Sequence, residues 1–298
     1  MQCVICSIAK NENAYLYEWA LYHLQLGFSH IYIYDNNDKD GECIENVFQS
    51  CDFKDKVSII DVRGQKYVQK HVYNLCYTQM SFDWCAFIDI DEFITLENHK
   101  NIEDFLSLYH DWESIHLNWK CYGDSGQVSY TTEGVTERFK KAWKKNFKYG
   151  YQNIPENAHI KSIIKKGLNI NWEYDSDEWS SNPHTPYGLN KICNPLFEQV
   201  ENKPFTPICH KVAYIRHYTT KTIEEYAIKV SRQCADCAAT FYSFQKFFRI
   251  NNVTLKKIIW LRRAYPTINI CDCIKEHIKY SIVNYNLPFQ FLFRSLKK

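Results

Sequence analysis

The segment 83–94, DWCAFIDIDEFI, constrains the fold more than any other part of the sequence. Its apolar run, 85–88, has the length and bulk of a strand buried in a parallel sheet. Three carboxylates follow within four positions, and the first two of them are Asp89 and Asp91. Because side chains alternate along a strand, we expect Asp89 and Asp91 on one side of it, facing the same ligand.

A divalent cation would explain this group of acids. Neighbouring carboxylates repel one another and are costly to desolvate unless a cation lies among them. Mg²⁺ and Mn²⁺ are held by one or two carboxylates, with the remaining positions left to water and substrate phosphates. The alternative is a pair of solvated acids in a turn, since an Asp-x-Asp pair is expected about once by chance in a chain of this length. The strand before Asp89 and the acid after Asp91 favour a metal and nucleotide-diphosphate site.

Strand-like and helix-like segments alternate along the N-terminal part of the chain. We predict strands at 3–8, 31–34, 57–62 and 85–88, and helices at 15–26, 44–51 and 67–81. The first helix ends at Gly27, a residue that favours a C-cap. Short alternating elements are typical of right-handed βαβ units on a parallel sheet, so the predicted fold class is α/β. Three of these strands end in polar or acidic residues, where ligands of such sheets bind.

Elements beyond residue 100 are less regular. We expect a helix at 103–109, a strand at 114–118 and a helix at 222–237, with 214–218 closing the catalytic part. The charge balance changes near residue 238, so the predicted organisation is one domain over 1–237 and an extension over 238–298.

Composition bears on the cellular compartment. No run of about 18 apolar residues exists, which argues against a transmembrane span. The first six residues lack a basic region and a cleavage site, so we interpret them as a strand and not a signal peptide. The 13 cysteines are an odd number and lie mostly in apolar runs, which suits reduced thiols. We therefore expect a cytoplasmic protein.

The extension is basic and aromatic. From residue 241 to 298 it holds eleven Lys and Arg against two acids, a net charge of +9, whereas the whole chain carries +2. Phenylalanine, tyrosine and tryptophan are interleaved with these cations. This pattern suits an anionic membrane surface, or a helix packed on the domain with a solvated basic face. A nucleic-acid partner is not expected.

Several common ligand motifs are absent. Residues 36–41 resemble the start of a calcium-binding loop, but its twelfth position is Val47 and not the required glutamate. The sequence has neither a P-loop nor a GxGxxG motif, which excludes P-loop kinases and dinucleotide-binding dehydrogenases.

Short motifs follow one another in a characteristic order along residues 3–233. They are Lys10-Asn11-Glu12, Tyr34-Asp35-Asn36, Ile88-Asp89-Ile90-Asp91-Glu92, Asn118-Trp119, Tyr122-Gly123-Asp124, His159-Ile160-Lys161, His184 and His217-Tyr218. This order resembles GT-A glycosyltransferases of the family 2-like and family 92 branch. The resemblance implies the GT-A fold, an α/β domain with a mostly parallel central sheet flanked by helices. It does not cover the chain after residue 237.

The resemblance also implies ligands. The donor would be a nucleotide-sugar, a UDP- or GDP-sugar, with Mn²⁺ or Mg²⁺ bridging its diphosphate. Asp89 and Asp91 match the metal motif, and His217 matches the histidine that often completes it. The implied donor contacts are Ala9, Asn11, Glu12, Asp35, Gln69, Lys70, Asn74, Asp89, Ile90, Lys229 and Arg232. Simpler interpretations are a packed histidine, capping or turn hydrogen bonds, and solvated helix charges.

An inverting transfer would need a carboxylate that takes the proton of the acceptor hydroxyl. Asp124, in a glycine-flanked loop after the 114–118 strand, is our first candidate for this base. Asp175, Asp177 and Glu178 are alternatives, and a turn residue is the simpler interpretation of Asp124. The metal would serve as Lewis acid for the departing phosphate.

We therefore expect transfer of a hexose-type unit to a saccharide or lipid-linked saccharide, in the assembly of a surface polysaccharide or lipopolysaccharide. The protein would be cytoplasmic or peripheral on the cytoplasmic face of a membrane. One alternative is a nucleotidyltransferase, although residues 10–13 lack the glycine-rich phosphate loop of that class. The other is a carbohydrate- or membrane-binding module without catalysis.

Overall fold

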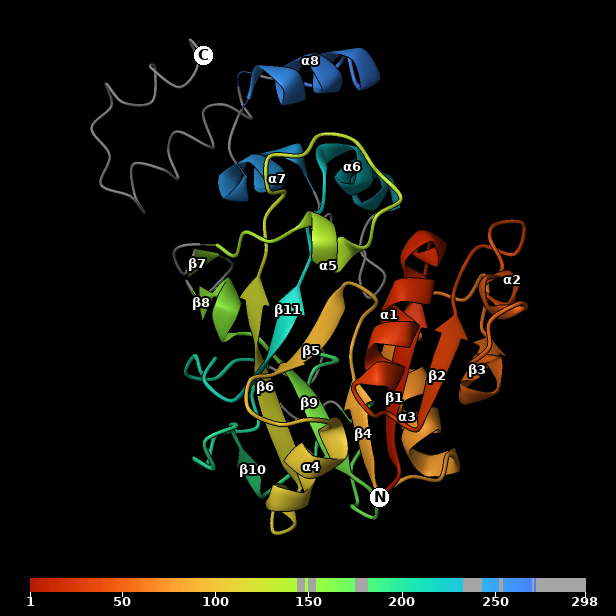
Figure 1. Ribbon diagram of the computed structural model, residues 1–298, viewed down its shortest axis with the longest axis vertical. Coiled ribbons are helices and arrows are strands. Elements are labelled where there is room, and N and C mark those ends of the chain that lie inside the picture. The colour runs from red at the N-terminus through yellow and green to blue at the C-terminus, as the bar shows by residue number, and fades with distance from the viewer. Residues whose placement is uncertain are drawn as a thin grey trace. The chain divides into compact units, whose positions relative to one another are not determined.

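The computed structural model describes residues 1–143, 148–149, 154–174, 182–232, 243–251, 254–269 and 271 (Figure 1). The chain divides into two compact units. The first comprises Met1–Lys120 and Lys148–His217, and the second comprises Cys121–Phe147 and Tyr218–Lys298. The boundary predicted after residue 237 lies outside the described residues and stays a prediction.

A mixed sheet forms the centre of the first unit. Its strands are β1 Cys3–Ala9, β2 His30–Asp35, β3 Val57–Asp61, β4 Trp84–Phe87, β5 Glu92–Leu96, β6 Ser114–Cys121, β9 Ile160–Lys165, β10 Ile192–Cys193 and β11 Ala213–His217. They lie in the order β3-β2-β1-β4-β9-β6-β11-β5, with β10 paired to β6. Neighbours from β3 to β4 run parallel, whereas β9 is antiparallel to β4 and β6, and β11 is antiparallel to β5. The strands β7 Lys148–Tyr149 and β8 Ile154–Pro155 form a separate pair.

This arrangement confirms the predicted α/β class, a mostly parallel sheet flanked by helices. The four N-terminal strands lie where the sequence placed them. The antiparallel strands β5 and β9 were not predicted: only residues 88–91 separate β5 from β4, and β9 follows the 3₁₀ turn Glu156–Ala158.

Helices cover the sheet of the first unit. They are α1 Asn13–Gln25, α2 Glu45–Phe48, α3 Gln69–Gln79 and α4 Ile102–Leu106, with short 3₁₀ turns at Lys54–Lys56, Ser107–Tyr109 and Glu156–Ala158. Helical spacing buries Leu16, Trp19 and Ala20 of α1. Gly27 follows α1 with a φ of +102°, as the predicted C-cap requires.

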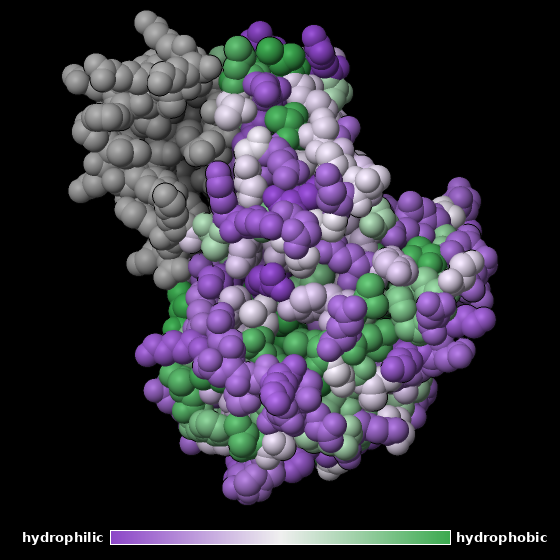
Figure 2. Space-filling view, in the orientation of Figure 1, coloured by the Kyte–Doolittle hydropathy of each residue, from purple (hydrophilic) through white to green (hydrophobic). Residues whose placement is uncertain are grey.

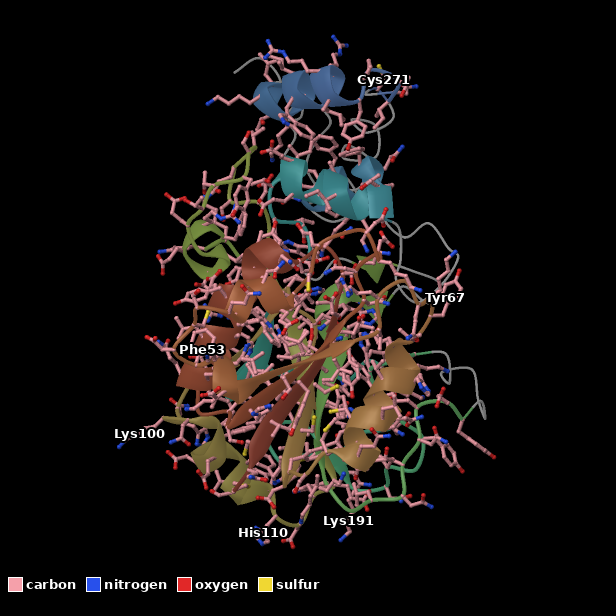
Figure 3. All side chains as sticks on the ribbon, turned by 90° about the vertical axis from the view of Figure 1, so that its right-hand side faces the viewer. Phe53, Tyr67, Lys100, His110, Lys191 and Cys271 are labelled. Atoms are coloured by element: carbon pink, nitrogen blue, oxygen red, sulfur yellow. The ribbon has the colours of Figure 1, made fainter. Side chains whose placement is uncertain are left out.

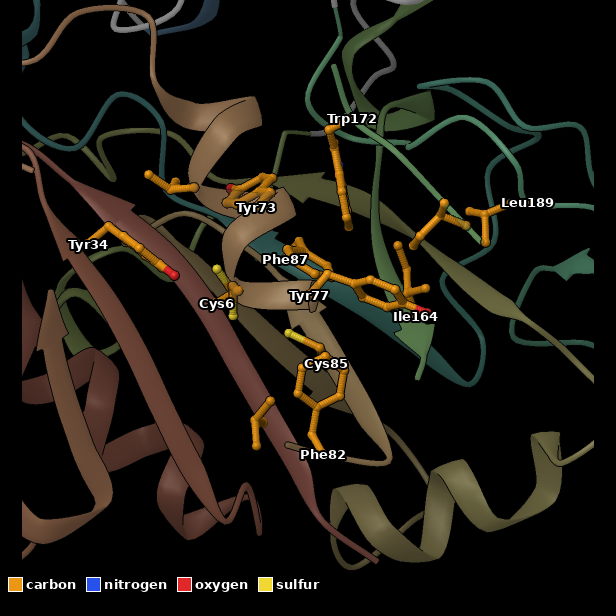
Figure 4. Packing of buried hydrophobic residues seen from close by; sticks show 14 of the residues in the cluster. Cys6, Tyr34, Tyr73, Tyr77, Phe82, Cys85, Phe87, Ile164, Trp172 and Leu189 are labelled. Carbon is orange, nitrogen blue, oxygen red and sulfur yellow. The ribbon is translucent and has the colours of Figure 1, made fainter. Parts of the chain in front are cut away.

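An aromatic and sulfur-rich core lies between α3 and the sheet (Figure 4). Cys6 of β1 and Cys85 of β4 are fully buried free thiols in this core. Tyr73 of α3 packs on Phe87 at a ring-centroid distance of 5.0 Å, and Trp172 packs on the same ring at 4.5 Å. These contacts fix the end of β4, and therefore the position from which the acidic segment starts.

The helices of the second unit are α5 Val135–Arg138, α6 Ile223–Arg232, α7 Phe244–Ile250 and α8 Leu255–Ala264. The helix predicted at 222–237 is confirmed over its described residues. Aromatic residues of the predicted extension form the core of this unit, with Phe244, Phe247 and Phe248 packed against α6 and Leu261. Among the helices within the described ranges, none has the length and apolarity needed to cross a bilayer.

A buried ion pair joins α5 to α6. Arg138 donates to both carboxylate oxygens of Glu225, at 2.9 and 2.7 Å. The two side chains are 2% and 3% exposed. Burial alone would raise the pKa of Glu225, but hydrogen bonds from Arg138 and Thr222 lower it below its usual value. Removing one partner of such a pair leaves a buried charge uncompensated.

We expect Glu225→Gln to lower the free energy of unfolding by about 3 kcal/mol at pH 7, because Arg138 stays buried without its counter-charge. The folded pKa of Glu225 lies below the unfolded value. Its contribution is therefore complete above the unfolded pKa of about 4.3 and is lost as the pH falls through the folded pKa. Urea denaturation of both proteins at several pH values measures this difference.

Glu137→Gln is the matched control, because Glu137 pairs with Lys140 on the surface, where the two side chains are 71% and 66% exposed. It should change stability little. An equally small loss in Glu225→Gln, or a loss that does not depend on pH, would contradict the expectation.

Candidate active site

The first two acids after β4, Asp89 and Asp91, lie in the link to β5 and not on a strand. β4 ends at Phe87 and β5 begins at Glu92, so Asp89 and Asp91 occupy a turn in which Ile90 is buried. Asp89 N–H donates to Glu92 Oε2 at 2.9 Å, and Glu92 N–H donates to the Asp89 carbonyl at 3.1 Å. The predicted strand alternation of Asp89 and Asp91 is therefore wrong. The chain turns here to start β5, which pairs antiparallel with β11, and each acid meets a different partner.

Asp89 is paired with a buried lysine. Lys161 of β9 places Nζ 2.7 Å from Asp89 Oδ2 and 3.5 Å from Glu92 Oε2. Burial would lower the pKa of Lys161, but Asp89 and Glu92 raise it above its ordinary value. Burial raises the pKa of Glu92 well above its usual range, so the lysine shares its charge mainly with Asp89. We call Lys161, Asp89 and Glu92 the lysine cluster.

Asp91 faces His217. His217 ends β11, which pairs with β5 so that His217 lies opposite Glu92. Its Nε2 is 3.7 Å from Asp91 Oδ1, and the two side chains are 10% and 9% exposed. Within the part of the chain that the structure describes, the Nδ1 atom of His217 has no hydrogen-bond partner. The structure thus brings together two of the three residues predicted as metal ligands.

Trp119 of β6 forms an aromatic wall beside this pair. Its ring centroid is 4.2 Å from that of His217, 5.1 Å from that of His159 and 5.3 Å from that of His184. Burial, helped by the nearby Lys161 charge, lowers the pKa of His184 well below its usual value. This lowered pKa favours the neutral form of His184, so its imidazole contributes ring surface beside Trp119.

Asp91 and His217 fit a divalent cation. Two donors that each lie about 2.1 Å from Mg²⁺ or Mn²⁺ can be at most about 4.2 Å apart, and these are separated by 3.7 Å. In the described residues, no group of three or more His, Cys, Asp or Glu is arranged to hold an ion. Lys161 already neutralises Asp89. The residues therefore suit an ion with two protein ligands and its other positions open to water and phosphate, and ligation by Asp89 stays a prediction.

Predicted nucleotide contacts lie at the ends of β1 and β2. Ala9 and Asp35 are paired across these strands. The Asp35 carboxylate accepts two backbone N–H groups of the following loop at 3.0 Å each, so it orders that loop. Asn11 has a φ of 54° and donates its N–H to Asn37 Oδ1 at 2.7 Å. Glu12 is buried at the start of α1. Their contacts with a nucleotide stay predictions.

The start of α3 reaches the acids. Gln69 donates to Asp89 Oδ1 at 3.3 Å, and Lys70 beside it is half-buried. Asn74 instead holds the segment 171–173, donating to Glu173 at 2.9 Å and to Asn171 at 2.8 Å. Just before α3, Tyr67 has a φ of 56° and is 58% exposed, on the outside of the unit (Figure 3). A positive φ at a bulky residue is a strained conformation of the kind found beside ligand sites.

The remaining predicted residues belong to the second unit. Asp124 is buried, forms an ion pair with Lys257 of α8, and accepts the Gly126 N–H at 2.8 Å. Lys229 is buried on α6, and Arg232 ends that helix. The alternatives for the base at positions 175, 177 and 178 lie outside the described residues. Catalysis by Asp124 stays a prediction.

Sequence analysis gave no role to Lys161 or Lys257. A signal for Lys161 was present, because it lies in the short segment 160–164 with three isoleucines and a serine, and a lysine in a buried strand is rare unless paired. Lys257 lies among many cations of the extension, where nothing in the sequence distinguishes a buried lysine from an exposed one.

The model of the family described as Glycosyltransferase family 92 matches residues 2–234. A glycosyltransferase family 92 protein of Arabidopsis thaliana is 26% identical over 257 residues, 78% of this chain and 37% of its own length. One of Oryza sativa subsp. japonica is 31% identical over 140 residues, 44% of this chain and 23% of its own length. The chain thus spans between 23% and 37% of the length of these curated relatives.

Two solved structures are similar at lower scores. The crystal structure of S. aureus TarS 1–349 in complex with UDP-GlcNAc has a TM-score of 0.42 and 11% identity, covering 94% of this chain and 71% of that one. HddC from Yersinia pseudotuberculosis has a TM-score of 0.32 and 13% identity, covering 56% of this chain and 70% of that one.

We expect Lys161→Met to lower the free energy of unfolding by about 3–5 kcal/mol at pH 7, because Asp89 and Glu92 lose their counter-charge. Without the ammonium, the folded state favours protonated acids. The deficit should therefore be smaller at about pH 5 than at pH 7, because proton uptake, which the raised pKa of Glu92 favours, removes uncompensated charge. Urea denaturation at both pH values measures this effect.

Lys165→Met is the matched control on the same strand, because Lys165 donates to a carbonyl oxygen, that of the exposed His110, at 2.7 Å, and not to a carboxylate. Lys161→Arg keeps the charge and should recover part of the loss. If Lys161→Met lost no more than Lys165→Met, or lost the same at both pH values, the electrostatic role of Lys161 would be refuted.

Proposed function

The chain belongs to glycosyltransferase family 92, and from that premise we propose that it transfers a hexose unit from a nucleotide-sugar to a saccharide acceptor. The observation that carries the proposal is the pairing of Asp91 with His217 beside the lysine cluster, at the carboxyl end of β4. These residues lie inside the matched range 2–234. The proposed donor is a UDP- or GDP-sugar, and the acceptor a saccharide or lipid-linked saccharide of a surface glycan.

Asp91 and His217 are the proposed ligands of Mn²⁺ or Mg²⁺. When bound, the ion would neutralise charge on the diphosphate that leaves the sugar. The chain's own part is to fix these ligands before substrate arrives. Lys161 holds Asp89, and Glu92 accepts the Asp89 N–H, so the turn that carries Asp91 is already ordered. Groups that need no reorganisation stabilise developing charge best.

Donor recognition is proposed for the loops at the carboxyl ends of the parallel strands. Asn11 and Tyr67 both have positive φ there, and Gln69 touches Asp89. Ligands of parallel sheets bind at this edge. The Trp119 ring beside His217 offers an apolar surface on which a sugar ring can stack.

We propose inversion, with Asp124 as the base. One carboxylate oxygen accepts the Gly126 N–H, and the carboxylate also pairs with Lys257. An acceptor hydroxyl would therefore replace the ammonium as a partner of Asp124. The pair orients the carboxylate, since both partners are buried.

We expect Asp91→Asn to lower metal-dependent turnover by at least about 100-fold, because an amide oxygen is a weaker ligand than a carboxylate. The measurement is release of nucleoside diphosphate from a panel of sugar nucleotides, with Mn²⁺, with Mg²⁺ and with neither. Asp111→Asn is the control, because the Asp111 side chain is 82% exposed. Full turnover in Asp91→Asn would remove the site assignment, and release from no donor would remove the proposed activity.

We expect Asp124→Asn to lower kcat by about 10²–10⁴-fold, because the amide cannot accept the acceptor's proton. It keeps an oxygen for the Gly126 N–H, so the loop can stay ordered. Lys257→Met tests the alternative, in which the ion pair between Asp124 and Lys257 stabilises the second unit and has no part in catalysis. Stopped-flow or steady-state kcat and thermal melting of both variants decide between them. Unchanged kcat in Asp124→Asn would exclude it as the base.

A further inference from the structure

The outer face of α8 is apolar and basic. Leu255 is 63% exposed and Ile259 is 41% exposed. These residues are four apart, so they lie one above the other on the helix. Lys256, Arg262 and Arg263 are exposed around them, and α8 holds no acidic residue. Figure 2 shows hydrophobic residues beside hydrophilic ones over α8.

The inner face of α8 is packed within the second unit. Leu261 is fully buried in the core that α6 and α7 share with α8. Lys257 is also fully buried and pairs with Asp124. Thr254 caps the helix by accepting the Lys257 N–H at 3.4 Å. The helix is therefore held in place, and the apolar residues on its outer face are exposed on a fixed scaffold.

The combination of exposed cations and exposed aliphatic side chains on α8 indicates the chemistry of its partner. Exposed cations on a helix that itself holds no acid attract a dense negative charge. Exposed aliphatic side chains gain free energy only where they leave water for an apolar phase. Nucleic acid satisfies the cations but gives Leu255 and Ile259 no apolar phase, whereas an anionic bilayer satisfies both.

We propose that the outer face of α8 binds the surface of an anionic phospholipid membrane. The helix lies in the interface, with Leu255 and Ile259 inserted among the acyl chains and Lys256, Arg262 and Arg263 at the phosphates. Ten residues span only about 15 Å, so the helix rests on the bilayer and does not cross it. This surface is independent of the proposed transferase chemistry.

The test is sedimentation of the 298-residue chain with two kinds of vesicle, pure phosphatidylcholine and phosphatidylcholine with about one third phosphatidylglycerol. We expect binding to the anionic vesicles. Its affinity should fall more than tenfold between about 0.05 and 0.5 M NaCl, because the Debye screening length shortens as salt is added. Leu255→Ser with Ile259→Ser should weaken binding at least about tenfold, because both insertions are lost. Replacing Arg262 and Arg263 by Gln should weaken it about fivefold for each cation.

Lys54→Gln with Lys56→Gln, at an exposed 3₁₀ turn of the first unit, is the charge-matched control and should bind as the parent does. Circular dichroism confirms that each variant is folded. Absence of binding by the folded parent would overturn the proposal. So would equal binding in the α8 variants, or binding to duplex DNA at least as tight as to anionic vesicles and unaffected by Leu255→Ser with Ile259→Ser.

Discussion

The buried ammonium of Lys161 is the interaction on which the site in the first unit depends. Three acids follow β4 within four positions, and Glu92 is fully buried. Burying an ionised carboxylate is costly unless a counter-charge lies beside it. Lys161 supplies that charge from β9, where it lies opposite Leu117 of β6 and reaches the turn beyond the end of β4. A one-residue slip of β9 would turn it to the other face of the sheet, so the register of β9 and the order of the acidic turn are set together.

The position of β9 also explains why the two aspartates behave differently. Asp89 and Asp91 both follow the carboxyl end of the parallel strand β4, whereas their partners come from antiparallel strands. β9 brings Lys161 to Asp89, and β11, paired with β5, brings His217 to Asp91. One carboxylate is thereby neutralised inside the protein, and the other faces an imidazole whose Nε2 can share an ion with it. Asp89 and Asp91 therefore form one motif in the sequence, but in the structure they lie in two different environments.

The parallel half of the sheet could be predicted because its information is local. Each strand from β1 to β4 is a short apolar run ended by polar residues, and Gly27 marks the end of α1. The acidic segment could be recognised for the same reason. Its geometry could not, because the turn at Asp89 leads into β5, and the partner strand β11 lies more than a hundred residues later in the sequence. The partner Lys161 depends likewise on β9 entering the sheet between β4 and β6, and no local pattern encodes which strands become neighbours.

The extension shows a second limit of prediction from sequence. A net charge counts every cation equally, whether its side chain is buried or exposed. Lys257 is instead fully buried with Asp124, and Phe247 lies in the core beside it. The two alternatives considered from the sequence, a packed helix and a basic exposed surface, do not exclude each other, because α8 has a buried face and an exposed basic face. With 3.6 residues per turn, a helix of ten residues can direct Lys257 and Leu261 inward and Leu255 and Ile259 outward. Because the inner face alone anchors α8, the outer face is not required for packing, and its exposed aliphatic residues need an explanation outside the fold of the chain.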